Sequence, residues 1–300
     1  YLKKIAAEIK NRSNILAKYE SRDTGKPITL ASEVDIPRAI ENFNFFANFS
    51  ENFYFESNIE SEVSINSVSK QALGVVGCIS PWNLPLYLFT WKIAPALIVG
   101  NTVLAKPSEI TPLTASKLAE ICSDIGLPAG VLNIVNGSGQ GAGDLLVKNK
   151  NIKAISFTGG TDTGKKIYQN SFASLKKLSL EMGGKNPAII FEDCNYESML
   201  KTVVKSSFTN QGQICLCSSR ILVEETIFEK FKTDFCNAIS ELNIGDPKYD
   251  KTQFGSITSD EQFKKIKHYI NLAKNENGNI LLGGKAIQLQ GRCKNGWFIE

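Results

Sequence analysis

The chain has 300 residues, of which 42% are hydrophobic, and this length can bury a sizeable core in one large or two ordinary domains. Its formal net charge is only +4, from 34 basic and 30 acidic residues, and the lysines are scattered rather than gathered into one stripe. A charge this small and this dispersed favours no nucleic-acid partner.

The opening residues predict an amphipathic helix, because Leu2, Ile5 and Ile9 recur at helical spacing. They do not have the pattern of a signal peptide, and no apolar run reaches the length of a membrane span, so we expect no membrane partner. The chain does not begin with Met, and its last residues, 296–300, end within a strand-like pattern. We therefore expect an internal fragment of a longer protein.

A turn is predicted at 23–27, where Gly and Pro interrupt the pattern, and a second helix at 33–49. This helix is dense in aromatic residues, and we expect Phe43, Phe45, Phe46 and Phe49 to lie in the core. Residues 52–69 alternate weakly and predict an antiparallel excursion.

From Gln71 onward, apolar strands alternate with helices, which is typical of a parallel sheet with crossover helices. Strands are predicted at 72–79, 101–105, 131–135, 154–157 and 177–180, and helices at 86–98, 111–125, 141–147 and 163–170. A second α/β unit is predicted to begin at 186–191, with helices at 198–207, 226–242 and 260–275.

The glycines of the first unit lie in turns but do not form the G-x-G-x-x-G run of a dinucleotide-binding fingerprint. They fall at Gly137, Gly139, Gly141, Gly143, Gly159, Gly160 and Gly164. Any tight turn from strand to helix can use glycine, so these residues alone are weak evidence for a cofactor site.

Three polar stretches carry residue types suited to carbonyl chemistry. Cys215 follows a glycine-containing turn, and a thiol attacks carbonyls readily because part of it is thiolate near neutral pH. Glu181 ends a strand-like run before two glycines, where a carboxylate can activate water. Asn83 lies between Pro81 and Pro85, whose restricted backbone would fix its amide as an oxyanion donor. A lone cysteine is otherwise most simply a small buried hydrophobe.

Seven cysteines, an odd number without framework spacing, indicate free thiols in a reducing compartment, and we expect a cytoplasmic protein. We expect no metal site, because Cys215 and Cys217 have no further Cys or His ligands at suitable spacings. The only histidine, His268, lies in a charged helical run and is expected to face solvent. The base for cysteine chemistry must then be a carboxylate, a lysine or water.

The three stretches resemble the aldehyde dehydrogenase superfamily, to which nearly the whole chain can be matched. Three runs look most like the 2-aminomuconic and 2-hydroxymuconic semialdehyde dehydrogenases: Asp35-Ile36-Pro37-Arg38, residues 79–87, and Ile214-Cys215-Leu216-Cys217. The resemblance implies Cys215 as nucleophile, Glu181 as general base, Asn83 as oxyanion donor and Lys92 as an aid to proton relay. For Lys92, an ordinary helix lysine is at least as good an interpretation.

The same resemblance implies that NAD is the cofactor. The implied NAD-binding residues are Ile79, Ser80, Pro81, Trp82, Lys106, Ser108, Glu109, Gly139, Gly143, Phe157, Gly159, Gly160, Thr163, Met182 and Gly183. Lys106 and Glu109 fit the adenosine ribose, where a carboxylate would repel the added phosphate of NADP. Without the rest of the pattern, they would be a salt-bridging pair before a helix. Gly160 departs from the family, which usually has serine there.

The resemblance also implies an α/β fold in two parts: an NAD-binding domain at 1–183, with an oligomerisation segment near 52–69, and an α/β catalytic domain at 184–300. The expected reaction oxidises a small aldehyde, such as the carboxylate-bearing 2-aminomuconic semialdehyde, to its acid through a thiohemiacetal and a thioester on Cys215, in a homodimer or homotetramer. Arg38 is expected to bind a carboxylate on the substrate, although a solvated helix arginine is an alternative. The rival functions are a CoA-acylating dehydrogenase, which characteristically lacks the carboxylate of Glu181, and a silent crystallin-like homologue.

Overall fold

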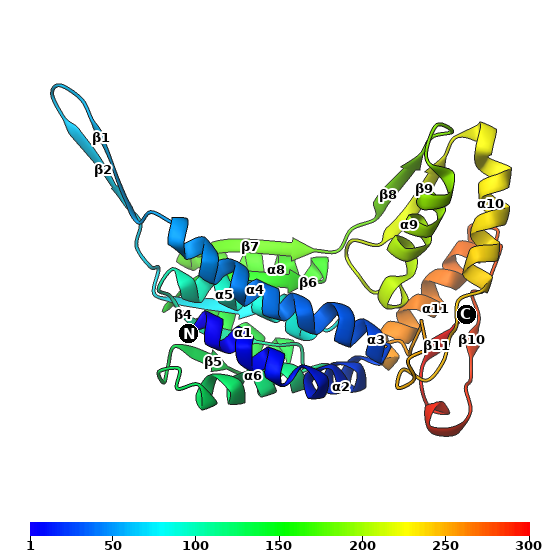
Figure 1. Cartoon of the computed structure of the whole chain (residues 1–300), viewed down its shortest axis with the longest axis horizontal. Coiled ribbons are helices and arrows are strands. Elements are labelled where there is room, and N and C mark those ends of the chain that lie inside the picture. Colours follow the sequence, from blue (N-terminus) through cyan, green and yellow to red (C-terminus); the bar gives the residue numbers. More distant parts are fainter. The chain divides into compact units, whose positions relative to one another are not determined.

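A computed structural model describes all residues, 1–300, and they form two compact units. The first unit comprises Tyr1–Ala17 and Ser32–Met182, and the second comprises Lys18–Ala31 and Gly183–Glu300. Residues 18–31 therefore group with the second unit, although they precede the first sheet in the sequence. Figure 1 labels the elements of each unit.

The first unit is built on a five-stranded sheet in the order β5-β4-β3-β6-β7, with every neighbouring pair parallel (Figure 1). Its strands are β3 Val75–Ile79, β4 Thr102–Lys106, β5 Leu132–Ile134, β6 Ile152–Gly159 and β7 Lys177–Met182. The chain runs outward from β3 to β5 and then returns to place β6 on the other side of β3. This reversal creates a topological switch point at the carboxyl ends of β3 and β6, which is where open α/β sheets bind ligands.

The crossover connections of this sheet are helical, as the alternating pattern predicted. They are α5 Pro85–Ile98, α6 Leu113–Asp124, the π-helical turn Gly139–Gly143 with α7 Asp144–Lys148, and α8 Thr161–Ser171. Apolar side chains from β3, β6, α7 and α8 form one buried cluster, namely Ile79, Leu146, Val147, Ile152, Ile155, Phe157 and Ile167. Burial of this cluster holds the carboxyl end of the sheet in a fixed geometry.

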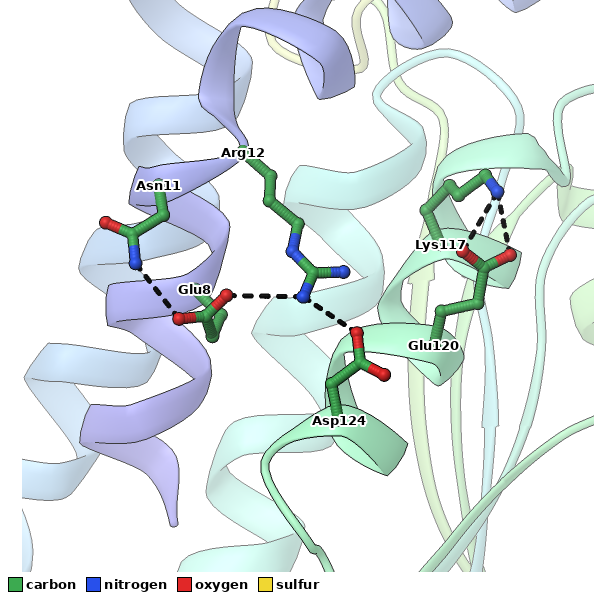
Figure 2. Close-up of polar contacts among 6 residues, drawn as sticks. All are labelled: Glu8, Asn11, Arg12, Lys117, Glu120 and Asp124. Atoms are coloured by element: carbon green, nitrogen blue, oxygen red, sulfur yellow. Dashed lines mark hydrogen bonds and ion pairs between the residues drawn. The ribbon is translucent and has the colours of Figure 1, made fainter.

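Three helices precede the sheet: α1 Leu2–Asn11, α2 Ser13–Thr24 and α4 Ile36–Phe49, with short turns at α3 Ile28–Leu30 and Ala31–Asp35 between the last two. Arg12, just after α1, donates to Asp124 of α6 at 2.7 Å and lies 3.3 Å from Glu8 (Figure 2). A second ion pair within α6, from Lys117 to Glu120, lies beside it in the same view. These contacts are solvent-accessible, so screening keeps their contribution small.

The aromatic helix α4 corrects one prediction. Phe43 is fully buried and Phe46 partly buried, but the side chains of Phe45 and Phe49 are 58% and 46% exposed, so their assignment to the core was wrong. Each residue of a helix turns by about 100°, so positions 45 and 49 share a face that points away from the core. Their rings stack on each other with centroids 6.4 Å apart.

The antiparallel excursion is confirmed as a hairpin of β1 Glu56–Glu60 and β2 Ile65–Ser69, in which every residue is exposed. It projects from the first unit beyond the end of α4 (Figure 1). Its register pairs Glu56 with Ser69 and Glu60 with Ile65.

The second unit contains the parallel pair β8 Asn186–Ile190 and β9 Ser218–Val223, joined through α9 Tyr196–Phe208. Two further helices, α10 Glu225–Ser240 and α11 Asp260–Asn275, and the short antiparallel pair β10 Ala286–Ile287 and β11 Phe298–Ile299 complete it. Ile190, Val203 and Phe231 form its buried apolar cluster. His268 lies exposed on α11, as expected. No helix in the chain combines the length and apolar character that a membrane span needs.

Candidate active site

The segment that carries Asn83 leaves the carboxyl end of β3 and enters α5. Pro85 occupies the first turn of α5, where its missing N–H costs nothing and its fixed φ suits the helix. Before it, the Ser80 N–H donates to the Lys106 carbonyl at 3.1 Å, and the Trp82 carbonyl accepts from the Thr111 hydroxyl at 3.1 Å. Asn83 is partly buried on a turn that is hydrogen-bonded to β4 and to the loop that follows β4.

Lys106 and Glu109 lie at the end of the neighbouring strand, β4. The Lys106 ammonium is buried and donates to the Pro107 carbonyl at 2.9 Å and to Glu109 at 3.2 Å. The other Glu109 carboxylate oxygen accepts from the Gly139 N–H at 3.2 Å. Burial alone would raise the pKa of Glu109, but hydrogen bonds from backbone N–H groups and from Lys106 outweigh it and lower the pKa. The structure thus brings Gly139 to the Lys106–Glu109 pair, although Gly139 lies 30 residues after Glu109 in the sequence.

At the opposite side of the switch point, β6 ends in Gly159 and α8 begins after Gly160. A Cβ on Gly159 would lie 2.5 Å from the Phe157 ring, and a Cβ on Gly164 would lie 2.5 Å from the Met182 sulfur, so a larger residue at either site would force its neighbour to move. Gly160 differs, because nothing lies within 4 Å of an added Cβ. It is the N-cap residue of α8, and no side chain caps this helix.

Glu181 is exposed one residue before the end of β7, where it pairs in register with Thr158 of β6. Lys92, on α5, is buried and donates from its ammonium to the Ser156 hydroxyl on β6 at 3.2 Å. Burial lowers the pKa of Lys92, although the nearby Cys78 and Glu181 favour its charged form. Lys92 is therefore buried rather than solvated, and the negative charge of Glu181 favours its protonated form.

Arg38 lies exposed on α4 and contacts two side chains of the first unit. It donates to Glu41 at 3.2 Å and to the Tyr87 hydroxyl at 3.1 Å, and its guanidinium carbon lies 5.3 Å from the centre of the Tyr87 ring. The hydrogen bond to Tyr87 is the largest of the interactions that raise the pKa of Arg38. Its charge is accessible to an anionic ligand, since half the side chain remains in solvent.

Cys215 belongs to the second unit, on the turn between α9 and β9. It is an exposed free thiol, whereas Cys217, two residues later, is buried and its pKa is raised mainly by that burial. The turn that leads to it is strained: Asn210 and Gln211 have φ values of 55° and 57°, in the left-handed region that non-glycine residues avoid. No group of three or more His, Cys, Asp or Glu side chains is arranged to hold a metal ion.

Side-chain amides hold this turn from two directions. Gln211 donates from its side-chain nitrogen to the Ser256 carbonyl at 2.8 Å, and Gln213 accepts from the Thr258 N–H at 3.2 Å. On the other side, the Asn186 amide nitrogen donates to the carbonyls of Cys215 and Cys217. No local sequence pattern predicts this role for the three amides, because their partners lie about 30 to 45 residues away along the chain.

The sheet order, the glycine turns and the ion pair at the strand ends define an α/β chain of dinucleotide-binding type, and this chain belongs to the aldehyde dehydrogenase family, whose profile matches residues 1–300. The resemblance predicted from the sequence is confirmed. Asn83, Glu181 and the other expected cofactor residues up to Met182 lie in the first unit, whereas Gly183 and Cys215 lie in the second.

Among its relatives, the 2-aminomuconic semialdehyde dehydrogenase of Danio rerio is 46% identical over 283 residues, which are 94% of this chain and 58% of the relative. The 5-carboxymethyl-2-hydroxymuconate semialdehyde dehydrogenase of Escherichia coli is 40% identical, over 95% of this chain and 61% of that protein. The chain thus spans about three fifths of the length of such relatives.

Solved structures agree with the fold. PnpE in complex with nicotinamide adenine dinucleotide superposes with a TM-score of 0.96 at 37% identity, over 100% of this chain and 61% of that one. Betaine aldehyde dehydrogenase from Staphylococcus aureus in complex with NAD+ superposes with a TM-score of 0.95 at 36% identity, over 100% of this chain and 59% of that one. The α/β fold that the sequence predicted is confirmed.

Proposed function

We propose that this protein oxidises an aldehyde that carries a carboxylate, such as 2-aminomuconic semialdehyde, to the corresponding acid with NAD as cofactor. The observation that carries the proposal is a family match over residues 1–300 in which Cys215 is an exposed thiol on a strained, tethered turn. Relatives that are 40–46% identical bear the names of muconic semialdehyde dehydrogenases, which supports the substrate class.

The residues at the switch point fit a dinucleotide. Ser80 has a buried hydroxyl that no protein group hydrogen-bonds, and Gly139 and Gly160 leave open space where a side chain would stand. The first residues of α8 offer backbone N–H groups to a diphosphate, and Glu109 is suited to the ribose hydroxyls of NAD and opposes the phosphate of NADP. The other residues proposed to line the cofactor are those that the sequence resemblance implied, from Ile79 to Gly183.

The chain's own residues would perform three tasks. The Cys215 thiolate forms a bond to the aldehyde carbon, and Asn83, with the backbone N–H of Cys215, stabilises the oxyanion that results. Bound NAD would supply the hydride acceptor, which leaves a thioester on Cys215. Glu181 then takes a proton from the water that attacks this thioester, and the thiolate departs as the acid is released. Lys92 would assist the relay of protons, as the family resemblance implies.

Arg38 would bind the carboxylate of the substrate, since its guanidinium can meet a carboxylate with two parallel hydrogen bonds. We assign NAD binding to the domain at 1–183 and catalysis to the domain at 184–300. We also infer a cytoplasmic homodimer or homotetramer: all seven cysteines are free, and the exposed hairpin with the Phe45–Phe49 face offers a surface for self-association.

The test is a stopped-flow measurement of NADH formation by the complete protein, with a carboxylate-bearing semialdehyde and a neutral aldehyde of similar length. We expect a burst of NADH, no requirement for CoA, and a higher specificity constant for the acidic substrate. Absence of any burst would favour the alternative that the protein is a catalytically silent, crystallin-like homologue. Turnover that depends on CoA would favour the acylating branch.

A further inference from the structure

The turn before Cys215 has an intrinsically unfavourable backbone conformation, so it must be stabilised by contacts with other parts of the protein. Asn210, Gln211 and Gly212 follow one another with φ values of 55°, 57° and 71°, and only glycine adopts this region without steric cost. Residues held in this way persist only where the surrounding structure over-determines them, and they cluster at functional sites. The contacts that hold this turn are therefore candidates for a role in catalysis.

One set of contacts fixes the start of the turn. Gln211 donates to the Ser256 carbonyl at 2.8 Å, while Gln213 donates to the Asn210 carbonyl at 3.2 Å and accepts from Thr258. The receiving segment is itself tied down, because the Ser256 N–H donates to the Gly25 carbonyl at 2.9 Å and the Ile257 N–H to the Trp297 carbonyl at 2.7 Å.

The other contact fixes the turn around the thiol. Asn186 begins β8 and pairs in register with Ser218, at the start of β9, so its side chain is carried by the sheet of the second unit. Its amide nitrogen has two hydrogens, which go to the carbonyls of Cys215 and Cys217, the latter at 3.3 Å. Fixing both carbonyls fixes the Cys215–Leu216 and Cys217–Ser218 peptide planes. The first of these planes adjoins the Cα of Cys215 and so restrains the direction in which its side chain leaves the backbone.

We propose that Asn186 and Gln211 are positioning residues that hold the Cys215 thiol in the orientation required for attack on the substrate carbonyl. This inference rests on the proposed role of Cys215 as nucleophile. The amide of Asn186 is the suitable group, since it offers two donors without a charge. An aspartate of the same shape would set carboxylate oxygens against two carbonyl oxygens and add a negative charge near the thiol.

The test compares Asn186→Asp and Asn186→Leu with Asn195→Ala in the complete protein. Asn195 is a matched control, because it lies in the same unit and its side chain also bonds one backbone group, the Ser198 N–H at 3.2 Å, where it caps α9. We expect both Asn186 variants to slow the NADH burst by about 10- to 100-fold, the range that misplacement of a reacting group produces. The dissociation constant for NAD should change by less than about 2-fold, since Asn186 holds the turn of the nucleophile and not the cofactor.

Hydrogen exchange of amides 209–217 gives a second readout that does not depend on aldehyde chemistry. We expect faster exchange in both Asn186 variants and in Gln211→Met, and no change in Asn195→Ala. The proposal is overturned if exchange in this turn is unaffected, or if the burst of Asn186→Asp matches that of Asn195→Ala. A wild-type protein that gives no burst would instead refute Cys215 as nucleophile. The exchange data would still show whether Asn186 and Gln211 hold the turn.

Discussion

Two turns of this protein carry proposed catalytic groups, and they are held by different means. The turn at 80–84, with Asn83, is restricted covalently by Pro81 and Pro85, is hydrogen-bonded to the adjacent strand, and contains no residue of positive φ. The turn at 209–217, with Cys215, contains two non-glycine residues in the left-handed region and depends on side-chain amides. Each such residue costs roughly 1–2 kcal/mol. The prolines of the first turn restrict its conformation locally. The second turn keeps its conformation only through hydrogen bonds to residues that are distant along the chain.

Glu181→Gln should have the largest effect, because it removes the proposed base for hydrolysis of the thioester that forms on the second turn. Attack by Cys215 does not need the carboxylate, but hydrolysis of the thioester does. We expect the NADH burst to persist while steady turnover falls on the order of 1,000-fold. Single-turnover and steady-state measurements on the complete protein check this. Equal loss of burst and turnover would contradict the assignment of Glu181 to hydrolysis.

Asn83→Ala tests the turn that proline restricts. Loss of one preorganised oxyanion donor should slow acylation by about 100-fold. Because Pro81 and Pro85 remain, hydrogen exchange of the turn should not change, in contrast to the effect expected for Asn186 variants. NAD affinity measured by fluorescence titration serves as the control, and a fall as steep as that of turnover would make Asn83 a packing residue.

The difference between the turns also explains which residues the sequence could reveal. Prolines around Asn83 and alternating apolar strands are local signals, and the predicted helix at 260–275 matches α11 residue for residue. Asn186 and Gln211 were missed as positioning residues because their function lies in contacts distant along the chain. Helix α2 was missed for another reason: its buried residues include Glu20, Ser21 and Thr24, so hydrophobic periodicity does not mark it.

Arg38→Ala should have a smaller, substrate-dependent effect outside both turns. Loss of a charge-assisted contact to a carboxylate costs on the order of 2 kcal/mol, or about 30-fold in kcat/KM for the acidic semialdehyde. Neutral aldehydes should be oxidised as well as before, since they do not use the contact. Competition between the two substrates in one assay measures the ratio directly. An equal loss on both would mean that the bonds from Arg38 to Tyr87 and Glu41 are structural.

Gly160→Ser is expected to have the smallest effect. It tests whether glycine is required at the start of α8. The backbone there is extended, with φ of −72° and ψ of 147°, and open space surrounds an added Cβ. A serine hydroxyl at an N-cap can accept from a free backbone N–H of the first helical turn, but it improves on glycine by only a few tenths of a kcal/mol.

The melting temperature of Gly160→Ser should therefore rise slightly, and the KM for NAD should change by less than about 3-fold, which corresponds to about 0.6 kcal/mol. Gly164→Ser is the matched control on the same helix. Its Cβ would meet the Met182 sulfur at 2.5 Å, so overpacking should destabilise the protein by about 1–3 kcal/mol. A comparable loss in Gly160→Ser would mean that this turn, like the one before Cys215, depends on contacts that its own backbone does not reveal.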